Sequence, residues 1–199
     1  MDLKLFSIDS IKSSIKPANF SFTGNLSHDD GIQLFLLSVS EASTVTIRTW
    51  SYSGGKNVAG EIVPAGGFDP ILTIFDYKGY FINESDDIDI HAGEYDAQLI
   101  QNLVGGYYIL AITQYPNTAK LNTLANAFLE GSGESKFNGR TCRMALDIHN
   151  VNAAWPISSK TSFILFGSGL LRLAEMIRKL FNRGAFRMLI NKLLISMLR

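Results

Sequence analysis

The sequence predicts an all-β protein, an antiparallel β-sandwich or jelly roll of about eight strands, followed by a C-terminal helical tail. Three observations support this fold class. Short apolar segments recur between turn-forming residues, glycines number 17 and aromatic residues make up 11% of the 199 positions, and strands do not alternate with helices. After Pro156 the apolar spacing changes from a period of two to the three-and-four spacing of helices.

The first three strands are predicted between residues 19 and 50. Residues 19–23 alternate aromatic with polar side chains before the break at Gly24. Residues 32–39 form an apolar run, which is typical of a strand buried on both faces. Residues 43–50 alternate cleanly, as a strand with one buried face does. The long loop that follows, residues 51–69, is of the kind that often carries function.

Five more strands are predicted at residues 71–75, 80–83, 97–101, 106–115 and 142–151. The first two of these flank a turn at residues 76–79 and form a hairpin. Residues 118–139 are predicted to be a polar excursion that contains a short helix at residues 121–128. The organisation that follows is an N-terminal segment (1–18), a β-sandwich domain (19–152), a linker (153–162) and an apolar, basic helical tail (163–199).

Charge is divided unevenly along the chain. Residues 1–159 contain 10 Lys and Arg against 17 Asp and Glu, whereas residues 160–199 contain 8 against 1. The acidic body argues against a nucleic-acid partner. In the tail, Arg172 and Glu175 interrupt the roughly 20 apolar residues that a spanning helix needs, so a helix lying in the membrane interface is favoured. A helix packed on its own sandwich or on a second copy is the alternative.

Both ends of the chain bear on its destination. Residues 1–16 hold no apolar run long enough for a signal peptide, so the chain as given shows no export signal at its start. The tail joins an apolar segment to Arg and Lys residues, which is typical of a segment held at a membrane with its positive end in the cytoplasm.

No catalytic motif is present in the sequence. His28, His91 and His149 lie far apart and form no zinc-binding pair. Cys142 is the single cysteine, which excludes an internal disulfide and cysteine-rich metal sites. An enzyme would need Cys142 with His149, or several carboxylates, to converge in a pocket. We therefore predict a non-enzymatic protein.

Acidic residues gather in and beside the turns between residues 69 and 96. Calcium binds six to eight oxygen ligands, and Asp side chains on turns supply them. Calcium is therefore a candidate cofactor, although no EF-hand spacing is present and a solvated acidic loop is the alternative. The candidate ligands are Asp69, Asp76, Asp86, Asp87 and Asp89.

Three stretches of the chain carry a family resemblance. They are FSFTG (20–24) with STVTIRTWSY (43–52) and GGFDPIL (66–72); IFD (74–76) with Asp86, Asp87 and GYY (106–108); and ALDI (145–148). Together they resemble a family of exported β-sandwich proteins related to the bacterial pre-peptidase C-terminal domain, over residues 19–152. The resemblance implies an exported binding or structural module. Related domains bind calcium, and some bind polymers such as collagen, which favours Asp86 and Asp87 as ligands.

The tail is similar to a PEP-CTERM sorting signal, through WPIS (155–158), LFGSGLL (165–171) and the basic pair at 178–179. The matching positions are Pro156, Ile157, Ser158, Gly167, Gly169, Arg178 and Lys179. Ser158 stands where a second proline is usual, and Arg172 where glycine is usual. The resemblance implies an exosortase-type sorting enzyme as a partner, membrane contact through the tail, and a location in the cell envelope or outside the cell. Exopolysaccharide is a candidate partner.

A second hypothesis is a carbohydrate- or polymer-binding accessory module. Exposed aromatic rings stack on sugars, and Trp50, Tyr52 and Tyr77 are the candidate platforms. The alternative is that these three aromatic side chains belong to the core.

Overall fold

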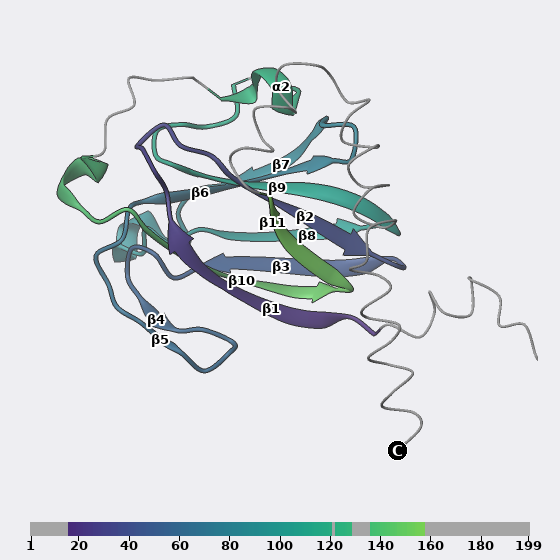
Figure 1. Cartoon of the computed structure of the whole chain (residues 1–199), viewed down its shortest axis with the longest axis horizontal. Helices are drawn as coiled ribbons and strands as arrows, with labels where there is room; N and C mark the ends of the chain where they lie inside the picture. The colour runs from purple at the N-terminus through teal and green to yellow at the C-terminus, as the bar shows by residue number, and fades with distance from the viewer. Residues whose placement is uncertain (1–15, 121, 129–135, 158–199) are drawn as a thin grey trace, which may run out of the picture. The chain divides into compact units, whose positions relative to one another are not determined.

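The computed structural model describes residues 16–120, 122–128 and 136–157 (Figure 1). The predicted helical tail, and with it Ser158, Gly167, Gly169, Arg178 and Lys179, lies outside the described residues. Within the described part of the chain, no helix is long and apolar enough to span a bilayer.

Two large antiparallel sheets form most of the described body, and Figure 1 shows them as two layers. The four-stranded sheet has the order β1 (Ala18–Asn25), β10 (Arg143–Val151), β3 (Ser43–Thr49) and β8 (Gln98–Leu103). The five-stranded sheet has the order β11 (Ala153–Ile157), β2 (Gln33–Val39), β9 (Gly106–Gln114), β6 (Pro70–Asp76) and β7 (Phe81–Ser85).

A single apolar core fills the space between the sheets, because alternate side chains of each strand point inward. The four-stranded sheet contributes Val45, Ile47, Leu99, Leu103, Met144, Leu146 and Ile148, and the five-stranded sheet contributes Phe35, Leu37, Val39, Leu72, Ile74, Leu110, Ile112 and Ala154. The predicted all-β, antiparallel architecture is thus confirmed in the described part of the chain.

Residues 34–37 illustrate how the five-stranded sheet is buried on both faces. All four side chains are at most 2% exposed, as the apolar run in the sequence predicts. Part of the outer face is covered by the excursion after β9. There, α2 (Leu124–Ala127) donates its Leu124 N–H to the Gly79 carbonyl oxygen, and Phe128 packs on Phe75 with 6.0 Å between ring centroids.

All eight predicted strands are present, with ends that differ by at most two residues. The loop at 51–69 is more ordered than predicted, since β4 (Gly55–Lys56) and β5 (Ile62–Val63) form a small hairpin within it. Two short helical turns were not predicted, η1 (Ile90–Ala92) and η2 (Phe137–Gly139).

The linker prediction was wrong for residues 153–157, which form β11 on the edge of the five-stranded sheet. The strand forms because Ala154 and Ile157 are buried, and because Pro156, which lacks an N–H group, is tolerated on an edge. The chain crosses from β10 to β11 at Asn152, whose N–H donates to Ser38 and whose Oδ1 accepts from the Ser40 N–H. Strands β10 and β11 thereby connect the two sheets.

Candidate metal centre

Asp69 lies directly before β6, and its position depends on the glycines that precede it. The N–H of Gly67 donates to the Ser51 carbonyl oxygen at 2.8 Å. A Cβ at position 67 would lie 2.4 Å from that oxygen and 2.6 Å from the Arg143 carbonyl oxygen, so only glycine fits. Phe68 is fully buried beside Phe137. These contacts fix the chain on the N-terminal side of Asp69.

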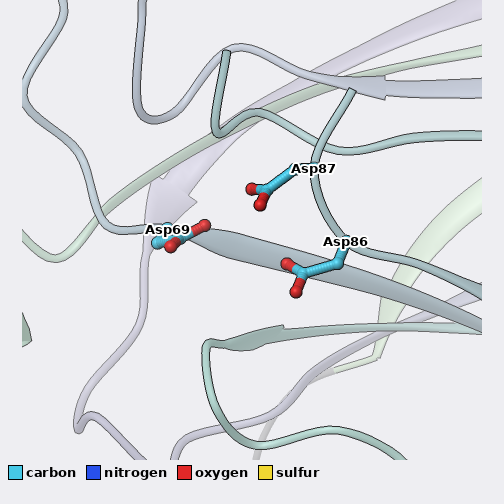
Figure 2. Close-up of side chains that lie close together, drawn as sticks. All are labelled: Asp69, Asp86 and Asp87. Atoms are coloured by element: carbon cyan, nitrogen blue, oxygen red, sulfur yellow. The ribbon is translucent and has the colours of Figure 1, made fainter. Parts of the chain in front are cut away.

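Asp86 and Asp87 reach the same place from β7. Strands β6 and β7 are antiparallel and Leu72 pairs with Ser85, so the chain leaving β7 passes the start of β6. As a result, Asp69, Asp86 and Asp87 each offer one carboxylate oxygen, and these oxygens lie within 4.8 Å of one another. Figure 2 shows the three carboxylates turned toward a common space.

The three carboxylates are partly enclosed and lack partners. One oxygen of each, Oδ1, is buried and has no hydrogen-bond partner in the described part of the chain. A fourth buried oxygen without a partner there is Oε1 of Gln114, a residue only 4% exposed. Gln114 pairs with Pro70, and the N–H of the next residue, Tyr115, donates to the Asp69 carbonyl oxygen. Gln114 therefore lies on the strand beside the start of β6.

The electrostatics of the site follow from this geometry. Burial, with the neighbouring Asp87 and Asp86 carboxylates, raises the pKa of Asp69 to about 7, although the nearby Arg140 guanidinium acts in the opposite direction. Burial, together with Asp87 and Glu84, raises the pKa of Asp86 to about 6. Burial also raises the pKa of Asp87. The cluster therefore resists carrying its full negative charge when no cation is near.

Asp76 and Asp89, the other two candidate ligands predicted from the sequence, serve as turn residues. Asp76 Oδ1 accepts hydrogen bonds from the N–H groups of Lys78 and Tyr80 at the far end of β6, roughly 23 Å along an extended strand from Asp69. Asp89 Oδ1 accepts from the N–H groups of His91 and Ala92. The structure brings together three of the five candidate ligands.

The three candidate stacking aromatics have different surroundings. The Arg48 guanidinium lies 4.2 Å from the ring centroid of Trp50, whose Nε1 donates to Asp147. Tyr52 contacts Tyr95 and the Arg140 guanidinium. Tyr77 is 51% exposed in the turn between β6 and β7. Of the three, Tyr77 has the most accessible ring.

Two buried carboxylates outside the aspartate cluster organise the loops. Asp96 accepts hydrogen bonds from Thr49 Oγ1 and from the N–H groups of Ser51, Tyr52 and Ser53. Asp147 accepts from Ser21 Oγ, Trp50 Nε1 and the Val58 N–H. The role of Asp147 was missed in the sequence, where its alternation with apolar neighbours indicates only a strand residue.

Cys142 and His149, on which one enzyme hypothesis depends, are placed apart. Cys142 precedes β10 and His149 lies near its end, so seven residues of extended chain, roughly 23 Å, separate them. An open cleft of about 340 Å³ lies between β1 and the β4–β5 hairpin, and it shares no lining residue with the aspartate cluster. Of the enzyme candidates named from the sequence, the acidic set alone converges.

Of the sorting-motif residues, Pro156 and Ile157 lie within the described part of the chain, in β11. Pro156 pairs with Phe35 and Ile157 with Leu34 of β2. Ile157 is 6% exposed, and its carbonyl oxygen accepts a hydrogen bond from Gln33 Nε2 at 3.0 Å. The first two positions of the predicted motif are thus part of the folded sheet.

No protein-family model matches the chain, and no curated protein matches it. Among solved structures, the pre-peptidase C-terminal domain of collagenase from Bacillus anthracis is similar at 10% identity, with 66% of this chain and 87% of that chain covered and a TM-score of 0.38. A protein from Sulfurospirillum deleyianum is similar at 14% identity, with 67% of this chain and 98% of that chain covered and a TM-score of 0.34. Similarity at this level concerns the fold alone.

Proposed function

We propose that this protein is a non-enzymatic β-sandwich module stabilised by a calcium ion, which Asp69, Asp86 and Asp87 hold at the start of β6. One observation carries the proposal: three carboxylates from two separate segments converge, and each has a buried oxygen without a hydrogen-bond partner in the described residues. Gathering like charges and leaving their oxygens unpartnered is costly, and a bound cation would offset both costs.

The donor chemistry favours calcium over other metals. All three groups are carboxylates, the hard oxygen ligands that calcium prefers, whereas structural zinc sites are built mainly from cysteine and histidine. Three carboxylates supply three oxygens when each binds through one oxygen, and more when any binds through two. The amide oxygen of Gln114 is a neutral candidate for a further position. Magnesium demands stricter octahedral geometry and usually retains several waters.

A thermal-melting series tests the calcium proposal. We expect a chelator to lower the melting temperature of the wild type and added calcium to restore it. The double variant Asp86→Ala/Asp87→Ala should lose this calcium dependence, while Asp89→Ala, a neighbouring aspartate that caps a turn, should keep it. A wild-type melting curve that calcium and chelator leave unchanged would rule out the site.

We extend the proposal to export, on the strength of the sequence resemblance. The module would reach the cell envelope or the exterior, where millimolar calcium suits a modest site. An exosortase-type enzyme would process the membrane-associated tail, and exopolysaccharide would be the surrounding polymer.

The folded position of β11 sharpens this export proposal. Because Ile157 is buried and its carbonyl oxygen is bonded to Gln33, we expect cleavage on the C-terminal side of Ile157. Mass spectrometry of the protein recovered from its native host would show the mature C-terminus. A terminus within residues 153–156 would contradict this expectation, since β11 would then be incomplete.

Carbohydrate or polymer binding is the second candidate function, and the exposed ring of Tyr77 favours it. Binding to a glycan array should be reduced in Tyr77→Ala. Trp50→Ala would test the less accessible ring. Absence of binding by the wild type across the array would remove this candidate and leave the calcium proposal untouched.

A further inference from the structure

Arg140 lies beside the aspartate cluster without pairing with it. Its guanidinium lowers the pKa of Asp69 by proximity, yet its hydrogen bonds go to main-chain oxygens. Nε donates to the Gly67 carbonyl oxygen at 2.5 Å, and Nη2 donates to the Tyr52 carbonyl oxygen at 2.8 Å. An arginine normally prefers a carboxylate, so this use of the side chain calls for a physical reason.

The two carbonyl oxygens belong to two loops that meet at the site. Gly67 lies two residues before Asp69, and its own N–H is bonded to Ser51. Tyr52 is held from the other side, because its N–H donates to the buried carboxylate of Asp96. The guanidinium also lies 3.3 Å from the ring centroid of Tyr52. One planar cation therefore joins the loop that carries Asp69 to a loop that Asp96 already fixes.

The turn that presents Arg140 has an unusual backbone. Phe137, Asn138 and Gly139 have φ values of +46°, +50° and +79°. A positive φ is a true outlier for a bulky residue such as phenylalanine. The turn is held by Asp29, whose carboxylate accepts the N–H groups of Lys136 and Phe137. Strained backbone of this kind tends to persist where it serves a site.

We propose that Arg140 is a positioning residue for the cation site: it fixes the loop that carries Asp69 and leaves the carboxylate oxygens free for a metal ion. The inference rests on the calcium site proposed above. Arg140 contributes a planar fork that lysine cannot reproduce, since lysine carries a single ammonium group. It acts through Gly67 and Tyr52, and it is not itself a ligand.

Two effects of removing Arg140 have opposite signs, and this makes the inference testable. Loss of a nearby positive charge favours cation binding, whereas loss of the carbonyl contacts leaves Asp69 poorly placed. If positioning dominates, Arg140→Lys and Arg140→Met both weaken binding, by about 10-fold as for other residues that support metal ligands. If Arg140 acts only as a charge, Arg140→Met binds calcium more tightly and Arg140→Lys binds it as the wild type does.

Titration calorimetry of the full chain with calcium alone provides the test, and urea denaturation in chelator records the stability of each variant separately. Arg143→Lys is the matched control, because Arg143 is a nearby arginine whose contact with the Pro64 carbonyl oxygen is long, at 3.4 Å. We expect it to bind calcium as the wild type does. Should Arg140→Met fail to fold, Asp29→Asn loosens the same turn more gently and is expected to weaken binding by less than the about 10-fold expected for Arg140→Lys.

Unchanged affinity in folded Arg140→Lys, or tighter binding in Arg140→Met, would overturn the inference and leave the calcium site intact. Absence of calcium binding by the wild type is a different result. It would remove the proposed function itself, so the two failures can be told apart.

Discussion

Two groups of enclosed aspartates in this molecule behave in opposite ways. Asp96 and Asp147 are 1% and 2% exposed, and each accepts at least three hydrogen bonds. The Asp69, Asp86 and Asp87 cluster is less buried, yet each member has an oxygen without a described partner. The first group receives its donors from the fold and therefore stabilises loops. The second lacks them, and a bound cation would supply what is missing.

The largest effect is expected from Asp96→Ala, which tests whether Asp96 stabilises the loops through its hydrogen bonds. The change leaves a buried hydroxyl and three backbone N–H groups without their acceptor. We expect a loss of about 3–4 kcal/mol in the free energy of unfolding, measured by urea denaturation. Glu41→Gln, at an exposed carboxylate, is the control and should change little. A loss below about 1 kcal/mol would show that solvent replaces these bonds.

Asp147→Asn should have the next largest effect. The amide keeps the size of the carboxylate but presents an NH₂ group to part of the donor set of Ser21, Trp50 and Val58. We expect a loss of about 2 kcal/mol, again by urea denaturation. If Asp147→Asn were as stable as the wild type, the carboxylate could not be what holds the β4–β5 hairpin against the four-stranded sheet.

The aspartate cluster should make the stability of the calcium-free protein fall as pH rises, whereas paired acids make stability fall as pH decreases. The folded pKa values of Asp69 and Asp86, about 7 and about 6, exceed the ordinary value of 3.8. Both carboxyl groups therefore hold a proton more tightly in the folded state than in the unfolded state. Their contribution to the free energy of unfolding is complete below the unfolded pKa and is lost as pH rises through the folded pKa values. Without calcium, stability should therefore fall between pH 4 and pH 7, by roughly 1–2 kcal/mol after allowance for partial exposure.

Melting temperatures in chelator across this pH range test the prediction. Saturating calcium should reverse the slope, because the ion binds the ionised carboxylates. The double variant Asp69→Asn/Asp86→Asn is the control and should show little of the cluster's slope in either condition. If melting temperature in chelator changed with pH equally in the wild type and in the double variant, the prediction would be contradicted.

The smallest effect on stability is expected from Asp86→Asn in chelator. This variant distinguishes most directly between a hydrogen-bonded acid and a member of the repelling cluster. Neutralising a hydrogen-bonded acid destabilises, but neutralising one member of a repelling cluster should stabilise the calcium-free protein by about 1 kcal/mol. The same variant should lose much of the stabilisation by calcium. Asp89→Asn serves as the matched control, with no gain expected. If Asp86→Asn destabilised the protein in chelator, Asp86 would behave like the hydrogen-bonded acids Asp96 and Asp147, and the prediction would be wrong.

Much of the fold could be predicted because strand formation depends on local pattern. The alternation in residues 43–50 and the apolar run at 32–39 determine strands regardless of their partners. Residues 153–157 were missed because five residues with a proline carry too weak a pattern; β2 makes them a strand. The hairpin within residues 51–69 was missed for the same reason, since each of its strands has two residues.

The candidate site was predicted only in part. Asp69, Asp86 and Asp87 lie in one acidic stretch together with Asp76 and Asp89, and nothing in their spacing separates the candidate ligands from the turn residues. The separation comes from the pairing of β6 with β7, which brings Asp86 to Asp69 and places Asp76 at the opposite end of the strand.

The sequence by itself determined the all-β class, the order of eight strands and the acidic stretch, because residue periodicity and turn chemistry act over a few neighbouring positions. The tertiary structure alone decided which acids receive donors and which do not. Asp147 meets Trp50, and Arg140 meets Gly67, across separations that local pattern cannot encode. A carboxylate's role depends on the groups that surround it in space, and those groups are assembled only when the sheets pack.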